Sequence, residues 1–80
     1  MTPKTTKSLK VRGYLKMFGI KSLDVARFAG VEASTVRSVL CGTRPSNNIR
    51  NATIELLRFA DPRIAKEIES LWPKGKRLAA

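Results

Sequence analysis

Apolar residues recur at helical spacing along most of the chain, and the pattern is clearest between Ser22 and Cys41. Two apolar stripes with a three- to four-residue period lie in this stretch: Val25, Ala26 and Ala29, and then Val36, Val39 and Leu40. Gly30 stands between the stripes, where one helix must end and the chain must reverse, and such a position favours a residue that is free to adopt positive φ. The pattern predicts two short helices joined by a tight turn at Ala29-Gly30-Val31.

A further helix is predicted on the N-terminal side of this stretch, from about residue 7 to residue 19. Its apolar positions recur at three- and four-residue spacing: Leu9, Val11, Tyr14, Leu15 and Phe18. Gly13 weakens this helix by about 1 kcal/mol relative to alanine, so it marks either the close approach of another element or a tolerated weakness. Gly19 closes the helix, and Ser22 is the expected N-cap of the next one, with Asp24 in its first turn.

Two more helices are predicted after a loop of glycine, proline, serine and asparagine at residues 42–48. The first covers about residues 48–60 and is expected to bury all or part of one apolar set: Ile49, Ala52, Leu56, Leu57 and Phe59. The second begins at Asp61-Pro62, where the aspartate caps the helix and the proline takes its first position, and it ends near Leu71 or Trp72. Its apolar face is expected to complete the core, with a two-fold dimer seam anchored by Trp72 as the alternative.

The chain is therefore predicted to be all-α, a compact bundle of about five short helices in one domain. Residues 7–72 form this domain, and residues 1–6 are predicted to be a flexible basic arm. Residues 73–80 are predicted to be a solvated basic tail that adds weak electrostatic affinity for nucleic acid.

The charge balance points to a polyanionic partner. Sixteen lysines and arginines against six acidic residues give a formal net charge of +10, and no acidic residue precedes Asp24. A single cysteine and no histidine leave no internal disulfide and no usual zinc ligand set. No export sequence or membrane-spanning run is indicated. We expect a cytoplasmic protein with no membrane association and no cofactor.

The second of the two short helices, from about Ala33 to Cys41, has a polar face opposite its apolar stripe. Four residues share this face: Ser34, Arg37, Ser38 and Cys41. Short polar side chains allow a helix backbone to approach base edges in the major groove, and an arginine can form paired hydrogen bonds with guanine O6 and N7. The face is therefore a candidate surface for reading DNA, and Arg37 is the leading base contact.

The run D-V-A-x-F-A-G-V-x-x-x-T-V-x-x-V, which begins at Asp24, resembles the helix-turn-helix of the lambda-repressor/Cro-like superfamily and is also similar to the Lac-repressor-type headpiece. Ala26 matches the small residue of the family's first helix, Gly30 its turn glycine and Val31 the apolar residue after the turn. Val36 and Val39 match the inward residues of its recognition helix. The resemblance covers residues 22–41 and implies a small regulator of the phage or prophage type.

The resemblance also implies a set of DNA-contacting positions. Within the second helix they are Ala33, Ser34, Arg37, Ser38 and Cys41. The segment after that helix lies against the DNA backbone in the family, which adds Thr43, Arg44, Asn47 and Asn48 as phosphate donors. Ser22 stands where many repressors carry a DNA-contacting glutamine, and Glu32 stands where serine or threonine usually caps the recognition helix.

Three of the candidate residues have two interpretations each. Ser22 is an N-cap that can also donate to a phosphate, and Arg27 is either a solvated side chain or a phosphate contact. Glu32 either complements the helix dipole or accepts a hydrogen bond from cytosine N4. The dipole role is favoured, because a carboxylate beside phosphates is repelled.

These observations predict a sequence-specific regulator that binds double-stranded DNA. One recognition helix reads few base pairs, so we expect a homodimer on an inverted repeat with half-sites roughly 34 Å apart. It would repress by covering a promoter on the nucleoid of a bacterial cell or phage-infected host, with no small-molecule effector. The alternatives are a non-specific architectural nucleic-acid-binding protein and a protein-interaction module of the antitoxin or phage accessory type. An enzyme is not expected, because the acidic residues are scattered and histidine is absent.

Overall fold

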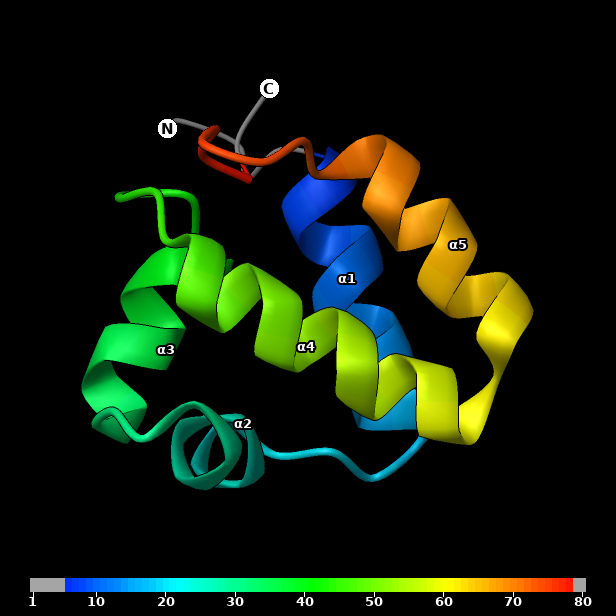
Figure 1. Ribbon diagram of the computed structural model, residues 1–80, viewed down its shortest axis with the longest axis horizontal. Coiled ribbons are helices and arrows are strands. Elements are labelled where there is room, and N and C mark those ends of the chain that lie inside the picture. The colour runs from blue at the N-terminus through cyan, green and yellow to red at the C-terminus, as the bar shows by residue number, and fades with distance from the viewer. Residues whose placement is uncertain (1–5, 79–80) are drawn as a thin grey trace.

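The computed structural model describes residues 6–78, and this part of the chain forms five helices and no strand (Figure 1). The helices are α1 (Thr6–Met17), α2 (Ser22–Ala29), α3 (Ala33–Leu40), α4 (Asn47–Ala60) and α5 (Pro62–Leu71). The prediction of an all-α fold with about five short helices is confirmed. Most of the flexible arm predicted at residues 1–6 lies outside the described residues, and Thr6 already belongs to α1.

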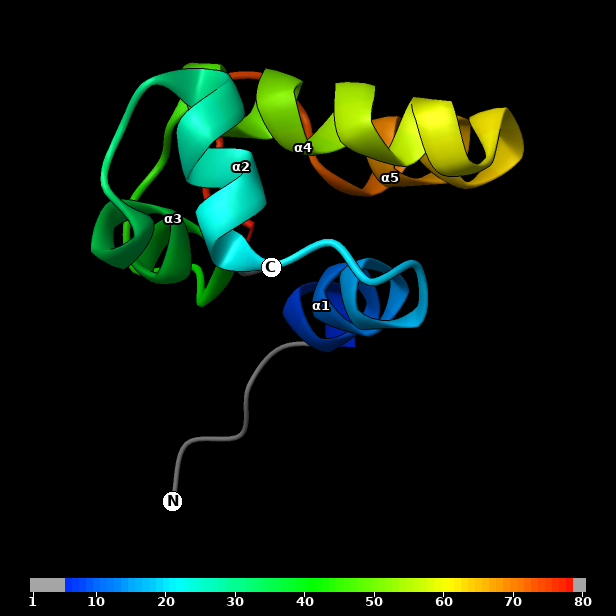
Figure 2. The same cartoon turned by 90° about the horizontal axis from the view of Figure 1, so that it is seen from below.

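Helix α4 holds the two ends of the molecule together. It runs along the long direction of Figure 1, with α2 and α3 at one end and α5 at the other. In Figure 2, α4 and α5 lie on one side of the molecule and α1 lies below them. The axes of α2 and α3 cross, since α2 is seen end-on in Figure 1 and α3 is seen end-on in Figure 2. Helix α3 is thus at the far end of the molecule from α5.

Helix ends follow the predicted stop and start residues at two positions. Gly30 has φ +73°, and its N–H donates to the carbonyl of Ala26, so α2 ends and the chain turns within the three residues before α3. Asp61 caps α5 by accepting a hydrogen bond from the N–H of Arg63 at 3.0 Å, and Pro62 occupies the first helical position. Both predictions are confirmed.

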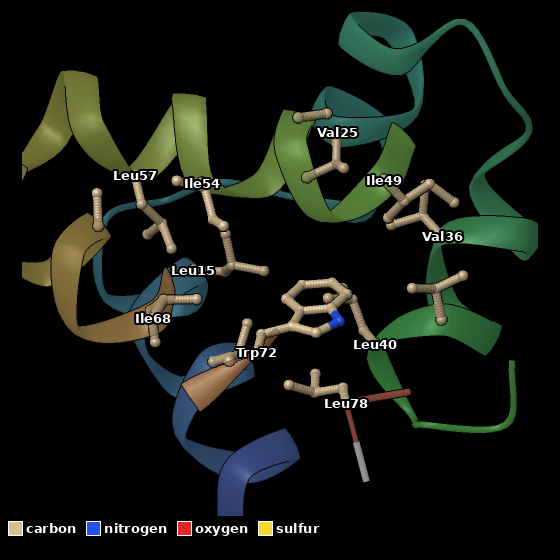
Figure 3. Close-up of a cluster of buried hydrophobic side chains, with 14 of the residues drawn as sticks. Leu15, Val25, Val36, Leu40, Ile49, Ile54, Leu57, Ile68, Trp72 and Leu78 are labelled. Atoms are coloured by element: carbon tan, nitrogen blue, oxygen red, sulfur yellow. The ribbon is translucent and has the colours of Figure 1, made fainter. Parts of the chain in front are cut away.

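The core consists of two groups of side chains joined at Trp72 (Figure 3). One group fills the space between α2, α3 and α4, and it includes Val25, Val36 and Ile49. The other lies between α1, α4 and α5, and it includes Leu15, Ile54, Leu57 and Ile68. The indole of Trp72 lies beside Leu40 and Leu78, and Trp72 and Leu78 are both 0 % exposed.

The burial of Trp72 confirms that the apolar face of α5 completes the core and excludes the alternative role of Trp72, and the burial of Leu78 corrects the prediction of a solvated tail. Trp72 cannot anchor a dimer seam, because its whole surface is used inside the monomer. The segment after α5 is not simply a solvated tail: the N–H of Gly75 donates to Asn47 Oδ1 at 2.7 Å, and Trp72 Nε1 donates to the carbonyl of Lys76 at 3.2 Å. A domain of this size has few apolar side chains to bury, so Leu78 is drawn onto the core.

Phe59 does not belong to the part of its apolar set that α4 buries. It was placed in the apolar set of α4, but its side chain is 81 % exposed while Leu57 is fully buried. Two residues apart on a helix, the two side chains point in different directions, and Leu57 takes the inward position. The N-terminal half of α4 instead buries Arg50, whose Nε donates to the carbonyl of Trp72 and whose guanidinium donates to Asn51 Oδ1 at 2.9 Å.

A polar cluster ties α1 to α5. Lys10 Nζ lies 2.7 Å from Glu67 Oε2, and the hydroxyl of Tyr14 donates to the same oxygen at 3.0 Å. The hydrogen bonds from Lys10 and Tyr14 lower the pKa of Glu67 below its ordinary value of 4.5. The hydrogen bond to Glu67 in turn raises the pKa of both Lys10 and Tyr14. These charges therefore stabilise the pairing of two helices.

No helix among the described residues has the length and apolar content needed to cross a membrane.

Candidate nucleic-acid interface

Helix α3 has one buried face and one open face. Val36 and Val39 are 0 % exposed, and Leu40 is buried beside Trp72. On the other side Ser34, Arg37 and Cys41 are exposed, while Ser38 and Ala33 are half-buried. The apolar stripe and the open polar face lie where the sequence pattern predicted them. Helix α3 lies at one end of the molecule (Figure 1), and its small polar side chains are exposed or half-buried.

The C-terminal end of α3 is fixed by two side-chain hydroxyl groups. Ser8 of α1 donates a hydrogen bond to the carbonyl of Leu40, and Thr43 Oγ1 donates to the carbonyl of Ser38 at 2.7 Å. The last carbonyls of a helix have no intrahelical partner, so the Ser8 hydroxyl satisfies the carbonyl of Leu40, while the carbonyl of Ser38 accepts from both the hydroxyl and the N–H of Thr43, the latter at 3.1 Å. Thr43 thus has a structural role, and its oxygen retains lone pairs that face solvent.

The N-terminus of α2 differs from the prediction. Ser22 was expected to be the N-cap, but it is the first helical residue and the N-cap is Lys21. Asp24 explains the shift, because its carboxylate reaches back and accepts a hydrogen bond from the N–H of Lys21 at 2.8 Å. The hydroxyl of Ser22 is therefore not consumed by capping.

Ser22 lines a small hollow together with residues from α1 and α3. The hollow has a volume of about 110 Å³, and its other lining residues are Arg12, Arg37, Leu40 and Cys41. Two guanidinium groups and a hydroxyl beside the N-terminus of α2 form a surface that attracts an anionic oxygen. Three predicted residues, Ser22, Arg37 and Cys41, are thus brought together.

Arg12 was missed by the sequence interpretation. Helical periodicity places it on the polar side of α1, but periodicity alone does not show that this side faces the end of α3. The available indication was the excess of basic residues before Asp24, which carries no information about position. Only the packing of α1 against α3 brings Arg12 to Arg37.

The cations at this end of the molecule have no carboxylate partner. Among residues 6–78 the ion pairs join Lys10 to Glu67, Arg58 to Glu55 and Glu69, and Arg63 to Asp61. None of them includes Arg12, Arg27, Arg37 or Arg44, which are all exposed. Positive charge without a carboxylate partner is thus present on α1, α2, α3 and the loop that follows α3.

The remaining predicted residues have mixed placements. Glu32 is exposed at the N-cap of α3 and its side chain makes no capping hydrogen bond. Asn48 Nδ2 donates to the carbonyl of Ala29 at 3.0 Å and ties α2 to α4, while Asn47 Oδ1 accepts from the N–H of Gly75. Both asparagines are exposed, but the side chain of each already makes a hydrogen bond that stabilises the fold.

The described residues include no group of three or more histidine, cysteine, aspartate or glutamate side chains placed to hold a metal ion. Comparison of the chain with models of known families, with curated proteins and with solved structures finds no match in any of the three.

Proposed function

We propose that the protein is a sequence-specific regulator that binds double-stranded DNA with α2 and α3 as a helix-turn-helix. The observation that carries this proposal is the open face of α3, on which short polar side chains and Arg37 lie next to cations that have no carboxylate partner. A helix with one buried apolar face and one face of small side chains can enter the major groove closely enough for direct contact with base edges.

In this proposal the contacts divide into two kinds. Arg12, Ser22 and Arg44 contact phosphates and displace counterions, which supplies affinity without sequence information. Arg37 forms paired hydrogen bonds with a guanine, and Ser34 and Ser38 contact neighbouring bases or phosphates. Ala33 packs against a thymine methyl group. Cys41 and Thr43 lie close to the DNA backbone. Arg27, Asn47 and Asn48 are peripheral phosphate donors, and Glu32 serves the helix dipole.

The working form is proposed to be a homodimer on an inverted repeat, with half-sites roughly 34 Å apart, which represses by covering a promoter. Since Trp72 is buried, the dimer must use another surface. Phe59 at the end of α4 is the most exposed of the large apolar side chains in the described part of the chain. It is the first residue to substitute when the dimer contact is sought.

The decisive experiment is selection of bound sequences from a random duplex pool with the wild-type protein and with Arg37→Ala. We expect an inverted repeat in the wild-type selection, and loss of preference at one base pair per half-site in the variant, at a cost of about 1 to 3 kcal/mol for that contact. Arg63→Ala is the matched control, because Arg63 is a 94 % exposed arginine on α5, at the other end of the molecule.

Other outcomes identify other functions. A pool without enriched sequences, despite salt-sensitive binding, contradicts the regulator and supports an architectural nucleic-acid-binding protein. Absence of duplex binding at low salt supports a protein-interaction module. Unchanged preference in Arg37→Ala removes Arg37 from base recognition.

A further inference from the structure

An open apolar cleft of about 600 Å³ lies between α1, the connection to α2 and the end of α3. Its apolar lining comes from Leu9, Leu15, Ile20 and Leu40, and Leu9 is about half exposed. A volume of this size falls within the usual range of ligand sites. DNA recognition does not require this cleft, since a phosphate backbone offers little apolar surface to pack against its apolar lining.

Gly13 lies in the wall of this cleft, next to open space. It lies within α1 and lines the cleft, and a Cβ atom built on it would meet no other atom within 4 Å. Close packing against another element therefore does not explain the glycine. The absence of a side chain at this position leaves apolar space that a ligand can fill.

The rim of the cleft is positively charged. Arg12, Lys16 and Lys21 line it, and no carboxylate does. All three side chains are exposed, and none takes part in an ion pair within residues 6–78. The cleft thus combines an apolar floor with a cationic edge.

We propose that this cleft binds an acidic amphipathic helix of a partner protein. Such a helix places apolar side chains at i, i+3, i+4 and i+7 into a groove, while acidic side chains beside them meet the basic rim. A second copy of this chain does not fit, because its surface is basic and five of its six acidic residues already have hydrogen-bond or ion-pair partners. The exception is Glu32.

Occupation of the cleft should interfere with DNA binding. The cleft shares Arg12, Ser22 and Leu40 with the hollow beside Arg37, so a bound acidic helix competes for the same cations as a phosphate. This consequence depends on the proposed function, whereas binding of the helix itself does not.

The test is display selection of helical peptides of about 15 residues on the full chain, with counter-selection on Gly13→Leu. Leucine has high helix propensity and its side chain would fill the cleft. We expect enriched peptides that carry apolar residues at helical spacing flanked by Asp and Glu. Their affinity should fall about tenfold or more for Gly13→Leu, and should stay within about twofold for Gly13→Ala, which changes helix propensity without filling the space.

Charge at the rim provides a second variant, independent of the first. Lys16→Glu should weaken the same peptides several-fold, and Lys66→Glu, an exposed lysine of α5, should not. Equal binding to wild type and Gly13→Leu, enrichment of peptides without acidic residues, or no enrichment would overturn the proposal. Binding of oleate that is lost in Gly13→Leu, with no peptide enriched, would overturn it in favour of a small amphipathic anion.

Competition with DNA separates the two proposals. An enriched peptide should release the selected duplex from the wild-type protein. Simultaneous binding of peptide and duplex would overturn the competition alone. Peptide binding by a protein that binds no duplex would leave the cleft assignment in place and overturn the proposed regulator.

Discussion

The α2–α3 pair and the α4–α5 pair use charge in opposite ways. On α4 and α5, Arg58 joins Glu55 and Glu69, and Glu67 reaches across to α1. On α2 and α3, Arg27 and Arg37 have no carboxylate partner within residues 6–78. Most of the few acidic residues thus form ion pairs within the scaffold, that is, α1, α4 and α5. The exposed Arg27 and Arg37 thus keep their charge available to a polyanion, as the proposed function requires.

The largest expected effect is in the scaffold. Trp72→Ala removes a fully buried indole at the junction of the two core groups, and we expect a loss of about 3 to 5 kcal/mol. A chain of 80 residues is stable by roughly 4 to 12 kcal/mol, so much of the protein should unfold. Urea unfolding followed by circular dichroism measures this. A loss below about 1 kcal/mol would contradict the central position of Trp72.

A smaller effect is expected on the unpaired cations. Arg12→Ala should leave the free energy of unfolding almost unchanged and weaken binding of every duplex about equally, with the slope of log affinity against log salt reduced by about 1. Binding titrations at several salt concentrations measure it. Arg63→Ala is again the control. A change in sequence preference rather than in the salt slope would show that Arg12 contacts a base.

Thr53 offers a stabilising substitution within the scaffold. Its Oγ1 is the buried side-chain polar atom that finds no hydrogen-bond partner among the described residues. Thr53→Val removes this hydroxyl group at nearly constant shape, and we expect a gain of about 1 kcal/mol in unfolding free energy. Thr43→Val is the contrasting variant, since Thr43 Oγ1 donates to Ser38, and it should not stabilise. Destabilisation by Thr53→Val would mean that the hydroxyl is satisfied.

The smallest effect concerns Glu67. Its pKa is lowered in the folded state by the hydrogen bonds from Lys10 and Tyr14, so its contribution is present above about pH 4.5 and is lost as the pH falls through the lower folded value. The hydrogen bonds to Glu67 also raise the pKa of Tyr14 and of Lys10 in the folded state. The stability that these bonds contribute is therefore present at neutral pH and is lost as the pH rises through the raised pKa values. Glu67→Gln should therefore be less stable than wild type at neutral pH and equal to it in acid. Denaturant titrations of both proteins at neutral and acidic pH measure the difference, and an equal loss at both pH values would contradict it.

The sequence predicted what local chemistry determines. The helical stripes, the left-handed Gly30 and the Asp61-Pro62 start depend on residues within a turn or two of each other, and all three predictions are confirmed. Ser22 shows where local rules compete, because a serine and an aspartate two residues apart can both close a helix end, and the aspartate does so. The backbone conformation at the start of the helix decides which of the two residues closes it.

The positions that could not be predicted depend on distant packing. Leu78 follows a proline and a glycine with no periodic neighbours, so no pattern indicates that it closes the core. Phe59 looked apolar enough to be buried, but α4 has no neighbour on that side. Arg12 joins the candidate site only because α1 contacts α3. The candidate face of α3 was predictable from the sequence, as were Arg27 and Arg44 as candidate phosphate contacts, and the contribution of Arg12 was not.

The position of Leu78 has a consequence for synthesis of the protein. All five helices precede this residue in the chain, yet its side chain covers Trp72 between the two core groups. While Leu78 is still inside the ribosomal exit tunnel, the indole of Trp72 is not covered and its apolar surface remains exposed to water. The core can thus close only after Leu78 has left the exit tunnel, so all five helices emerge before the residue that completes their packing.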